Sequence, residues 1–524
     1  MRVHHLTAAL ATTTLAVALA PAVAAPAYAA GQDRAPSHSS PHALAALEKV
    51  HGLLAGTLPQ GSTTGAPDVT MALVKLMGQR DHLAPRDRRQ ADALFARPDQ
   101  PGSPTYSEDQ DSNADWDTSE VAAAKSTCAD TTMWGVNNFC VHWVPADALD
   151  AAGNASSQRS TDAAVQATVD TLKTVWTTET GTDAGQLGFL APKADGIRGG
   201  TGSTNKLDVY LADTGAAHNY GYAVPEQSTD ASFGYLVLDN DFSTKQFPST
   251  TTTPDEARQV TAAHEFFHLV QFAYDSYESP WLMEATATWM EEQVYDDIDD
   301  NRQFIPSGSL RHRSQPLDTF LANSGAQYGT WVFPELISEQ FGTDSIRDVW
   351  VSAGKTAGRN PRSALDSALK LRGSSLRQEF LNFTGASMAP SRFPEFWSEG
   401  AAYYPAAIMG KTWKLSTATK STGSWTAGVD HLASADFSVT PDASLTANWK
   451  MRLTIAAPAD SGTAYAIVVY KDGHVGKAPL TLTDGKLVRS FPFSVGAVSR
   501  ISVALGNSST ANGRETHFSA TIWR

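Results

Sequence analysis

Basic residues are scarce in this chain relative to acidic ones. Lysine and arginine number 40 against 55 aspartates and glutamates, which gives a formal net charge of −15 at pH 7. The sequence also has no long run of lysine or arginine. Because proteins that bind nucleic acid or an anionic membrane surface usually carry basic patches, both classes of partner are disfavoured.

Long hydrophobic runs are missing, apart from one at the amino terminus. Residues 1–29 combine Arg2, an apolar stretch over 8–20 and Ala27-Tyr28-Ala29, the pattern of a secretory signal and its cleavage site. The stretch is too short and too rich in Ala and Thr for a spanning helix, which takes about 20 predominantly apolar residues. We expect a secreted, extracellular protein with no membrane anchor in its mature form.

Cysteine is nearly absent. Cys128 and Cys140 are the only two. In an exported protein such a pair most simply forms one disulfide, and closing a loop of this size is worth on the order of 3 kcal/mol. A thiolate nucleophile would need a reduced cysteine in an oxidising compartment, so cysteine catalysis is disfavoured.

The most informative stretch is an H-E-x-x-H motif, His264-Glu265-Phe-Phe-His268. Upstream, residues 253–256 (T-P-D-E) read as an N-cap, a first-turn proline and a capping-box glutamate, so a helix should begin there. On a helix the two histidines lie one turn apart on the same face and can bind one metal ion. Glu265 lies beside that metal, where it can act as a general base on a water.

A second helix is expected to begin at Ser279-Pro280 and to carry Glu284. A catalytic zinc site takes three protein ligands and a water, and a glutamate from a packed helix commonly completes a pair of histidines. We therefore predict Zn²⁺ bound by His264, His268 and Glu284.

These two helices resemble the gluzincin group of zinc metallopeptidases, in which an H-E-x-x-H helix precedes a helix with a ligand glutamate. Residues 281–287 (W-L-M-E-A-T-A) are similar to the W-L-N-E-G-F-A stretch of metalloaminopeptidases, and 253–295 resembles a family of secreted bacterial proteins classed from sequence as metalloproteases. The resemblance implies a zinc peptidase.

The chain departs from the gluzincin pattern at two points. Thr288 stands where thermolysin-like enzymes place an aspartate that orients a ligand histidine, and the Gly-x-Met-Glu-Asn motif of aminopeptidases is absent. Exopeptidase specificity is therefore not implied. Metzincins are disfavoured because Gln271 and Tyr274 occupy the positions of their glycine and third histidine.

The predicted fold class is α+β. A helical pattern at 162–177 and strand patterns at 207–211 and 233–238 precede the motif helix. This is the order in which zincin domains place a small twisted sheet above the site, with a helical lower half. Residues 234–238 are the strand that we expect to pair with extended substrate.

Four segments are expected along the chain. The signal at 1–29 precedes a helical and linker segment at 30–118, which is either a propeptide or an ordinary extension. The zinc peptidase domain follows at 119–410. Alternating apolar runs at 411–524 indicate a β-sandwich of about seven or eight strands.

Three further features are candidates for the site. Tyr328, at the start of a helix expected over 327–342, is the candidate donor to the oxyanion, because gluzincins commonly use a Tyr or His from this half. The carboxylates at 296–300 suit either Ca²⁺ or a solvated helix end. His142, in a strand pattern, is either a ligand, a substrate contact or an ordinary packed residue.

The sequence thus predicts a secreted, monomeric zinc metallopeptidase that hydrolyses protein or peptide substrates, with Glu265 as general base and Tyr328 as oxyanion donor. Two alternatives stay open. One is a non-catalytic secreted binding or adhesion protein on a peptidase-like scaffold. The other is a zinc hydrolase of cell-wall amide bonds.

Overall fold

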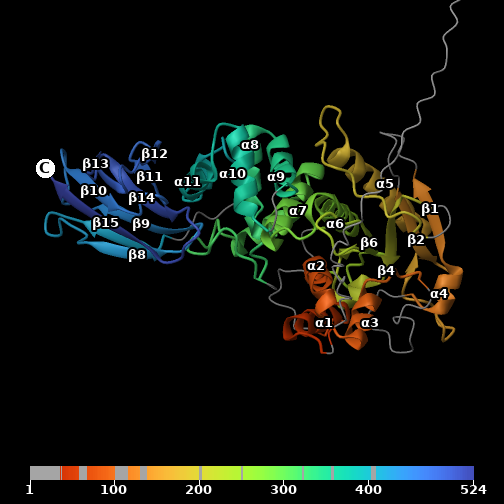
Figure 1. The fold of residues 1–524 in the computed structure, drawn as a ribbon. Coiled ribbons are helices and arrows are strands. Elements are labelled where there is room, and N and C mark those ends of the chain that lie inside the picture. Colours follow the sequence, from red (N-terminus) through yellow and green to blue (C-terminus); the bar gives the residue numbers. More distant parts are fainter. Residues whose placement is uncertain are drawn as a thin grey trace, which may run out of the picture.

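The computed structural model describes residue 36 and residues 38–57, 68–100, 116–129, 139–199, 203–248, 252–321, 324–355, 359–402 and 409–524. Figure 1 shows a part built of helices around one sheet, and a β-rich part at the carboxyl-terminal end. The α+β fold class is confirmed. The expected signal at 1–29 lies outside the described residues.

One mixed sheet has the strand order β1-β2-β4-β6-β5, with β3 beside β2. The strands are β1 Lys125–Ala129, β2 Phe139–Pro145, β3 Arg159–Ser160, β4 Leu207–Ala212, β5 Gly221–Pro225 and β6 Gly234–Asp239. β2, β4 and β6 run parallel, whereas β1 and β5 run antiparallel to their neighbours.

The strand expected to bind substrate needs correction. Residues 234–238 lie in β6, which is hydrogen-bonded to β4 on one side and to β5 on the other. A strand with both sides paired has no free main-chain groups to offer a substrate. The strand order ends at β1 and at β5, and β5 is the edge strand in contact with α6 (Pro254–Asp275).

Side chains of each strand alternate between the two faces of the sheet. Leu207 and Val209 pack on the face that carries α5 (Asp162–Thr180) and α6 (Pro254–Asp275). Tyr210 points to the opposite face. The motif helix α6 therefore lies directly under the sheet.

Three amino-terminal helices cover the opposite face (Figure 1): α1 Pro41–Leu54, α2 Val69–Gln79 and α3 Pro85–Leu94. Helix α2 belongs to both cores, because Leu73 and Leu76 pack on this face while Met71 and Val74 pack with α6. Helix α2 therefore lies at the edge of the sheet, beside β5, and contacts the cores on both faces.

The remaining helices are α4 Thr118–Ala123, α7 Pro280–Val294, α8 Val332–Phe341, α9 Asp344–Ala353, α10 Pro361–Leu371 and α11 Leu376–Ala386. The helix expected over 327–342 begins later than predicted, because Tyr328–Thr330 forms a separate 3-10 turn. Gly329 lies against the backbone of Phe304 and Gly308, where a Cβ would clash. The turn leads through Trp331 into α8.

Residues 409–524 form the expected β-sandwich, with nine strands within this fully described stretch. One sheet has the order β13-β10-β15-β8 and the other β12-β11-β14-β9-β7. The strands are β7 Lys411–Leu415, β8 Trp425–Val429, β9 Ala433–Pro441, β10 Lys450–Ala456, β11 Gly462–Tyr470, β12 Val475–Pro479, β13 Lys486–Pro492, β14 Val498–Asn507 and β15 Arg514–Trp523.

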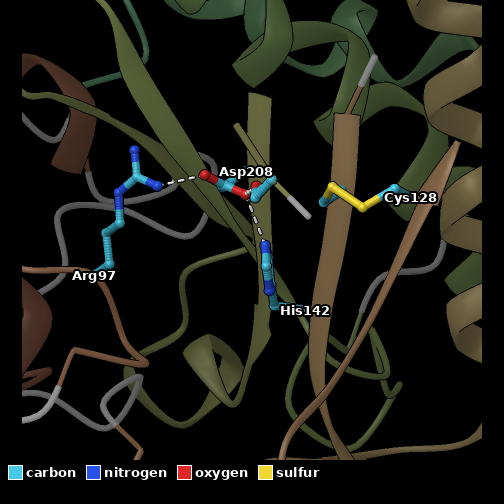
Figure 2. The surroundings of a disulfide bond; sticks show 6 residues. Arg97, Cys128, His142 and Asp208 are labelled. Carbon is cyan, nitrogen blue, oxygen red and sulfur yellow. Dashed lines mark hydrogen bonds and ion pairs between the residues drawn. A yellow bond between two sulfur atoms is a disulfide. The ribbon is translucent and has the colours of Figure 1, made fainter. Parts of the chain in front are cut away.

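The disulfide between Cys128 and Cys140 is confirmed, and it joins directly opposed residues of β1 and β2 (Figure 2). Among the described residues no helix is long and apolar enough to cross a membrane.

Candidate metal centre

Helix α6 presents the H-E-x-x-H motif. It begins as expected, with a capping box between Thr253 and Glu256 and with Pro254 in the first turn. The side chains of His264 and His268 lie 4.8 Å apart between ring centroids and are both buried. One helix face thus directs two imidazoles into the interior.

Helix α7 brings Glu284 to these histidines. Its Oε2 lies 3.2 Å from Nε2 of His264, and its Oε1 lies 3.5 Å from Nε2 of His268. One ligand atom from each residue falls within 4.8 Å of the other two. In the part of the chain that the structure describes, no second group of this kind gathers.

The donor set fits zinc. Two imidazole nitrogens and a carboxylate oxygen are the ligands of many catalytic zinc sites, which keep a fourth position open. Ligand distances of about 2.1 Å in a tetrahedron place neighbouring ligand atoms roughly 3.4 Å apart. The 3.2 Å and 3.5 Å spacings, each to a different oxygen of Glu284, are of this size.

The outer ring nitrogens of both histidines are held. Nδ1 of His264 lies 2.7 Å from Oε1 of Glu291, and Nδ1 of His268 lies 2.8 Å from Oε1 of Gln271. Gln271 in turn donates to the carbonyl of Met283 on α7. Because the acceptors favour a proton on each Nδ1, both Nε2 atoms face the candidate metal position, where each would offer a lone pair to a bound cation.

Neither orienting partner was predicted in that role. The thermolysin-like aspartate position holds Thr288, whose buried hydroxyl has no hydrogen-bond partner. Glu291, three residues further along α7, takes the place of that aspartate. Spacing of three or four residues along a helix would have indicated Glu291 as a neighbour of Thr288.

Glu265 is in contact with the amino-terminal segment. The hydroxyl of Thr70 donates to Oε2 of Glu265 at 2.9 Å and accepts from the backbone N–H of Ala223 in β5, also at 2.9 Å. Burial raises the pKa of Glu265 to about 7, with Glu284 adding to the rise. A carboxylate with such a pKa can both accept and return a proton near neutral pH.

The two histidines differ in protonation. Burial lowers the pKa of His268 to about 4, so this imidazole is neutral, as a ligand must be. Burial also acts to lower the pKa of His264, but hydrogen bonds to Glu284 and Glu291 outweigh it and raise that pKa well above its usual value. The proton on Nε2 of His264 then stands where a metal cation would replace it.

Tyr328 lies beside this cluster. Its ring centroid is 5.9 Å from that of His264, and the side chain is 8% exposed. Burial raises the pKa of Tyr328 well above 10, with the charges of Glu284 and Asp68 adding to the rise. The phenol is therefore protonated and can donate a hydrogen bond.

Other candidates lie elsewhere. His142 in β2 is bonded to Asp208 at 2.7 Å and stacks on Tyr210, on the sheet face away from α6 (Figure 2). The carboxylates at 296–300, all described, do not gather into a metal-binding group. Tyr220 stacks on Phe247 at 4.0 Å.

Comparisons with known proteins give a family without a described activity. No curated protein matches the chain. The chain is similar to the pre-peptidase C-terminal domain of collagenase from Bacillus anthracis, at 6% identity over 22% of this chain and 93% of that domain, with a TM-score of 0.15. It is also similar to a GH115 4-O-methyl-alpha-glucuronidase, at 8% identity over 52% of this chain and 38% of that enzyme, with a TM-score of 0.14. TM-scores this low show neither a common fold nor a function.

The match to a protein family is more extensive. The family of unknown function DUF6055 matches residues 104–389, more than half of the chain, and this stretch includes α6, α7 and Tyr328. The chain therefore belongs to the DUF6055 family.

Proposed function

We propose that this protein is a secreted zinc metallopeptidase that hydrolyses peptide bonds in protein or peptide substrates. The observation that carries the proposal is the convergence of His264, His268 and Glu284 within 4.8 Å, with both Nδ1 atoms held by acceptors. A merely structural cluster would have no need to keep Glu265 beside these ligands.

The chemistry divides between the metal and the chain. Zinc held by the three residues would polarise the scissile carbonyl and supply an activated water. Glu265 accepts the proton of that water and passes it to the leaving amine. Tyr328, protonated and next to His264, donates a hydrogen bond to the negative charge that develops on the carbonyl oxygen.

A zinc assay and a casein digest test the proposal together. Purified protein should carry close to one zinc per chain, and His268→Ala should lose it. Glu265→Gln should keep the zinc and lose turnover by about 10²–10⁴-fold, because a carboxamide cannot take up the proton. Unchanged hydrolysis by Glu265→Gln would point to a contaminating protease.

Glu292→Gln is the matched control. Glu292 is a buried glutamate of the same helix α7, bonded to Asn301 and outside the metal cluster. It should change neither zinc content nor turnover. Full zinc in wild type without hydrolysis of casein or of any peptide would favour a non-catalytic scaffold or a different amide substrate.

A further inference from the structure

The amino-terminal segment, described at residues 38–57 and 68–100, reaches the metal cluster at the edge of the sheet. Met71 and Val74 of α2 pack into the core around α6, and Thr70 lies between Glu265 and β5. These residues lie outside the part of the chain that matches the DUF6055 family, which begins at residue 104. The contact therefore comes from outside the stretch that matches the family.

Thr70 occupies the groups that an extended substrate would use. A substrate strand pairs with a sheet through outward-facing main-chain groups of the edge strand. The N–H of Ala223 in edge strand β5 is such a group, and it donates to the hydroxyl oxygen of Thr70 as it would to a substrate carbonyl. The same hydroxyl donates its hydrogen to Oε2 of Glu265, the residue that would accept the proton of the attacking water.

Asp68 brings a buried acid to the same place. It caps α2 through Oδ1, which accepts from the N–H of Met71, while Oδ2 is buried without a hydrogen-bond partner. The side chain is 3% exposed, and burial raises its pKa well above the ordinary value. The charge of Glu284 adds to the rise and the charge of Lys49 opposes it. A buried carboxylate is costly unless cations lie nearby, and a metal held by Glu284 would add a cation to the effect of Lys49.

The segment is firmly anchored to the sheet. Arg97, which is 1% exposed, forms ion pairs with Asp195, Asp208 and Glu226, and the helices share a hydrophobic core with the sheet. Such burial holds α2 in place at the edge of β5.

We propose that residues 38–57 and 68–100 close the metal centre of the full-length chain, with Thr70 in the position of a substrate carbonyl and the buried Asp68 two residues before it. The proposal rests on the proposed function, because it assigns the regulation of that same centre. The closed form slows both the loss of bound zinc and the entry of substrate in the full-length chain.

Two substitutions in the full-length chain loosen the closure without removing a metal ligand. Thr70→Val deletes the hydroxyl and keeps the shape, and Asp68→Asn removes the charge but keeps a good helix cap. Thr168→Val is the matched control, since Thr168 is a buried threonine of α5 whose hydroxyl bonds only the carbonyl of Ala164.

The first readout is the rate at which zinc passes from the protein to a chelator, which requires no catalysis. Each variant should release zinc at least tenfold faster than wild type and Thr168→Val. Equal release rates in all four proteins would overturn the closure.

The second readout is casein hydrolysis. Thr70→Val and Asp68→Asn should raise kcat/KM at least tenfold. A fall in both would instead make Thr70 a positioning residue for the base, and the segment a part of the working enzyme. Faster zinc release with no hydrolysis in any protein leaves the closure standing and removes the peptidase function, whereas absence of zinc from every protein overturns both.

Discussion

Two buried polar clusters lie on opposite faces of the same sheet. The arginine cluster comprises Arg97, His142, Asp195, Asp208 and Glu226, and the metal cluster comprises His264, Glu265, His268, Glu284 and Glu291. Figure 2 shows Arg97 and His142 on either side of Asp208. Both clusters gather three carboxylates with imidazole in the protein interior.

The clusters differ in what balances their negative charge. Arg97 supplies a guanidinium that contacts all three carboxylates of its cluster. Among the described residues, no lysine or arginine lies within ion-pair distance of Glu265, Glu284 or Glu291, whose charged partners are histidines. Because buried charges need compensation, the arginine cluster is balanced by its own guanidinium, whereas the carboxylates of the metal cluster have, in the described part of the chain, only histidines as charged partners and would accept a cation.

Removing the internal cation is the strongest way to test this difference. Arg97→Met leaves three buried carboxylates without their partner, and breaking a buried pair of this kind costs about 3–5 kcal/mol. We expect a loss of that size in chemical denaturation. Arg198→Met is the control, because Arg198 faces the same Glu226 at 3.8 Å from an exposed position and should cost about 1 kcal/mol or less. If both variants lost the same free energy of unfolding, Arg97 would contribute no more to stability than the exposed Arg198.

The pH dependence of the metal-free protein provides a second test. The pKa of Glu265 is about 7 in the folded protein against an ordinary value of 4.5. Its contribution to stability is therefore fully present below about pH 4.5 and is lost as the pH rises through 7, by up to about 3 kcal/mol. A glutamine cannot ionise, so the Glu265→Gln variant should not lose this part of its stability as the pH rises. Urea unfolding at pH 5 and pH 8, with chelator, measures it.

Zinc should reverse that behaviour, because its charge compensates the ionised carboxylates. If zinc-loaded and metal-free wild type lose the same stability between pH 5 and pH 8, the cluster does not depend on a cation.

Substitution of Tyr328 tests whether the metal cluster catalyses hydrolysis. Tyr328→Phe keeps the ring that packs on Phe304 at 5.0 Å and removes only the hydroxyl. If the hydroxyl meets the oxyanion, kcat should fall about a hundredfold, with zinc content and Tm unchanged. A lower Tm with the same kcat would assign Tyr328 to packing, and the donor would then be sought at His218 or Tyr220, since His142 lies on the other face of the sheet.

Local signals explain what the sequence could predict. The capping box at Thr253, the proline in the first turn of α7 and the four-residue spacing of His264 and His268 act within one or two helical turns. They predicted both helices and the three candidate ligands.

Contacts between distant segments explain what the sequence could not predict. Thr70 and Glu265 are 195 residues apart, and no local pattern links them. The edge strand β5 was missed because its five residues begin with Gly and end with Pro, which usually signal turns. A sequence pattern that omits β5 makes β6 appear to be an edge strand, which is why the sequence predicts β6 as the strand that pairs with substrate.

The residue that orients His264 differs from the one that the gluzincin pattern predicts. Substituting it is the test with the smallest expected effect. The gluzincin pattern places the orienting carboxylate at the position of Thr288, but the structure places it at Glu291, whose Oε1 lies 2.7 Å from Nδ1 of His264. A carboxylate bound to the outer nitrogen strengthens the imidazole as a ligand and fixes its tautomer.

Glu291→Gln retains an oxygen acceptor but removes the charge, so zinc affinity should fall about 10–100-fold while the fold is kept. Chelator competition measures the affinity, with Glu292→Gln as the neighbouring control. Equal affinities in the two variants would mean that the charge of Glu291 does not support the metal, and that His264 is oriented by packing alone.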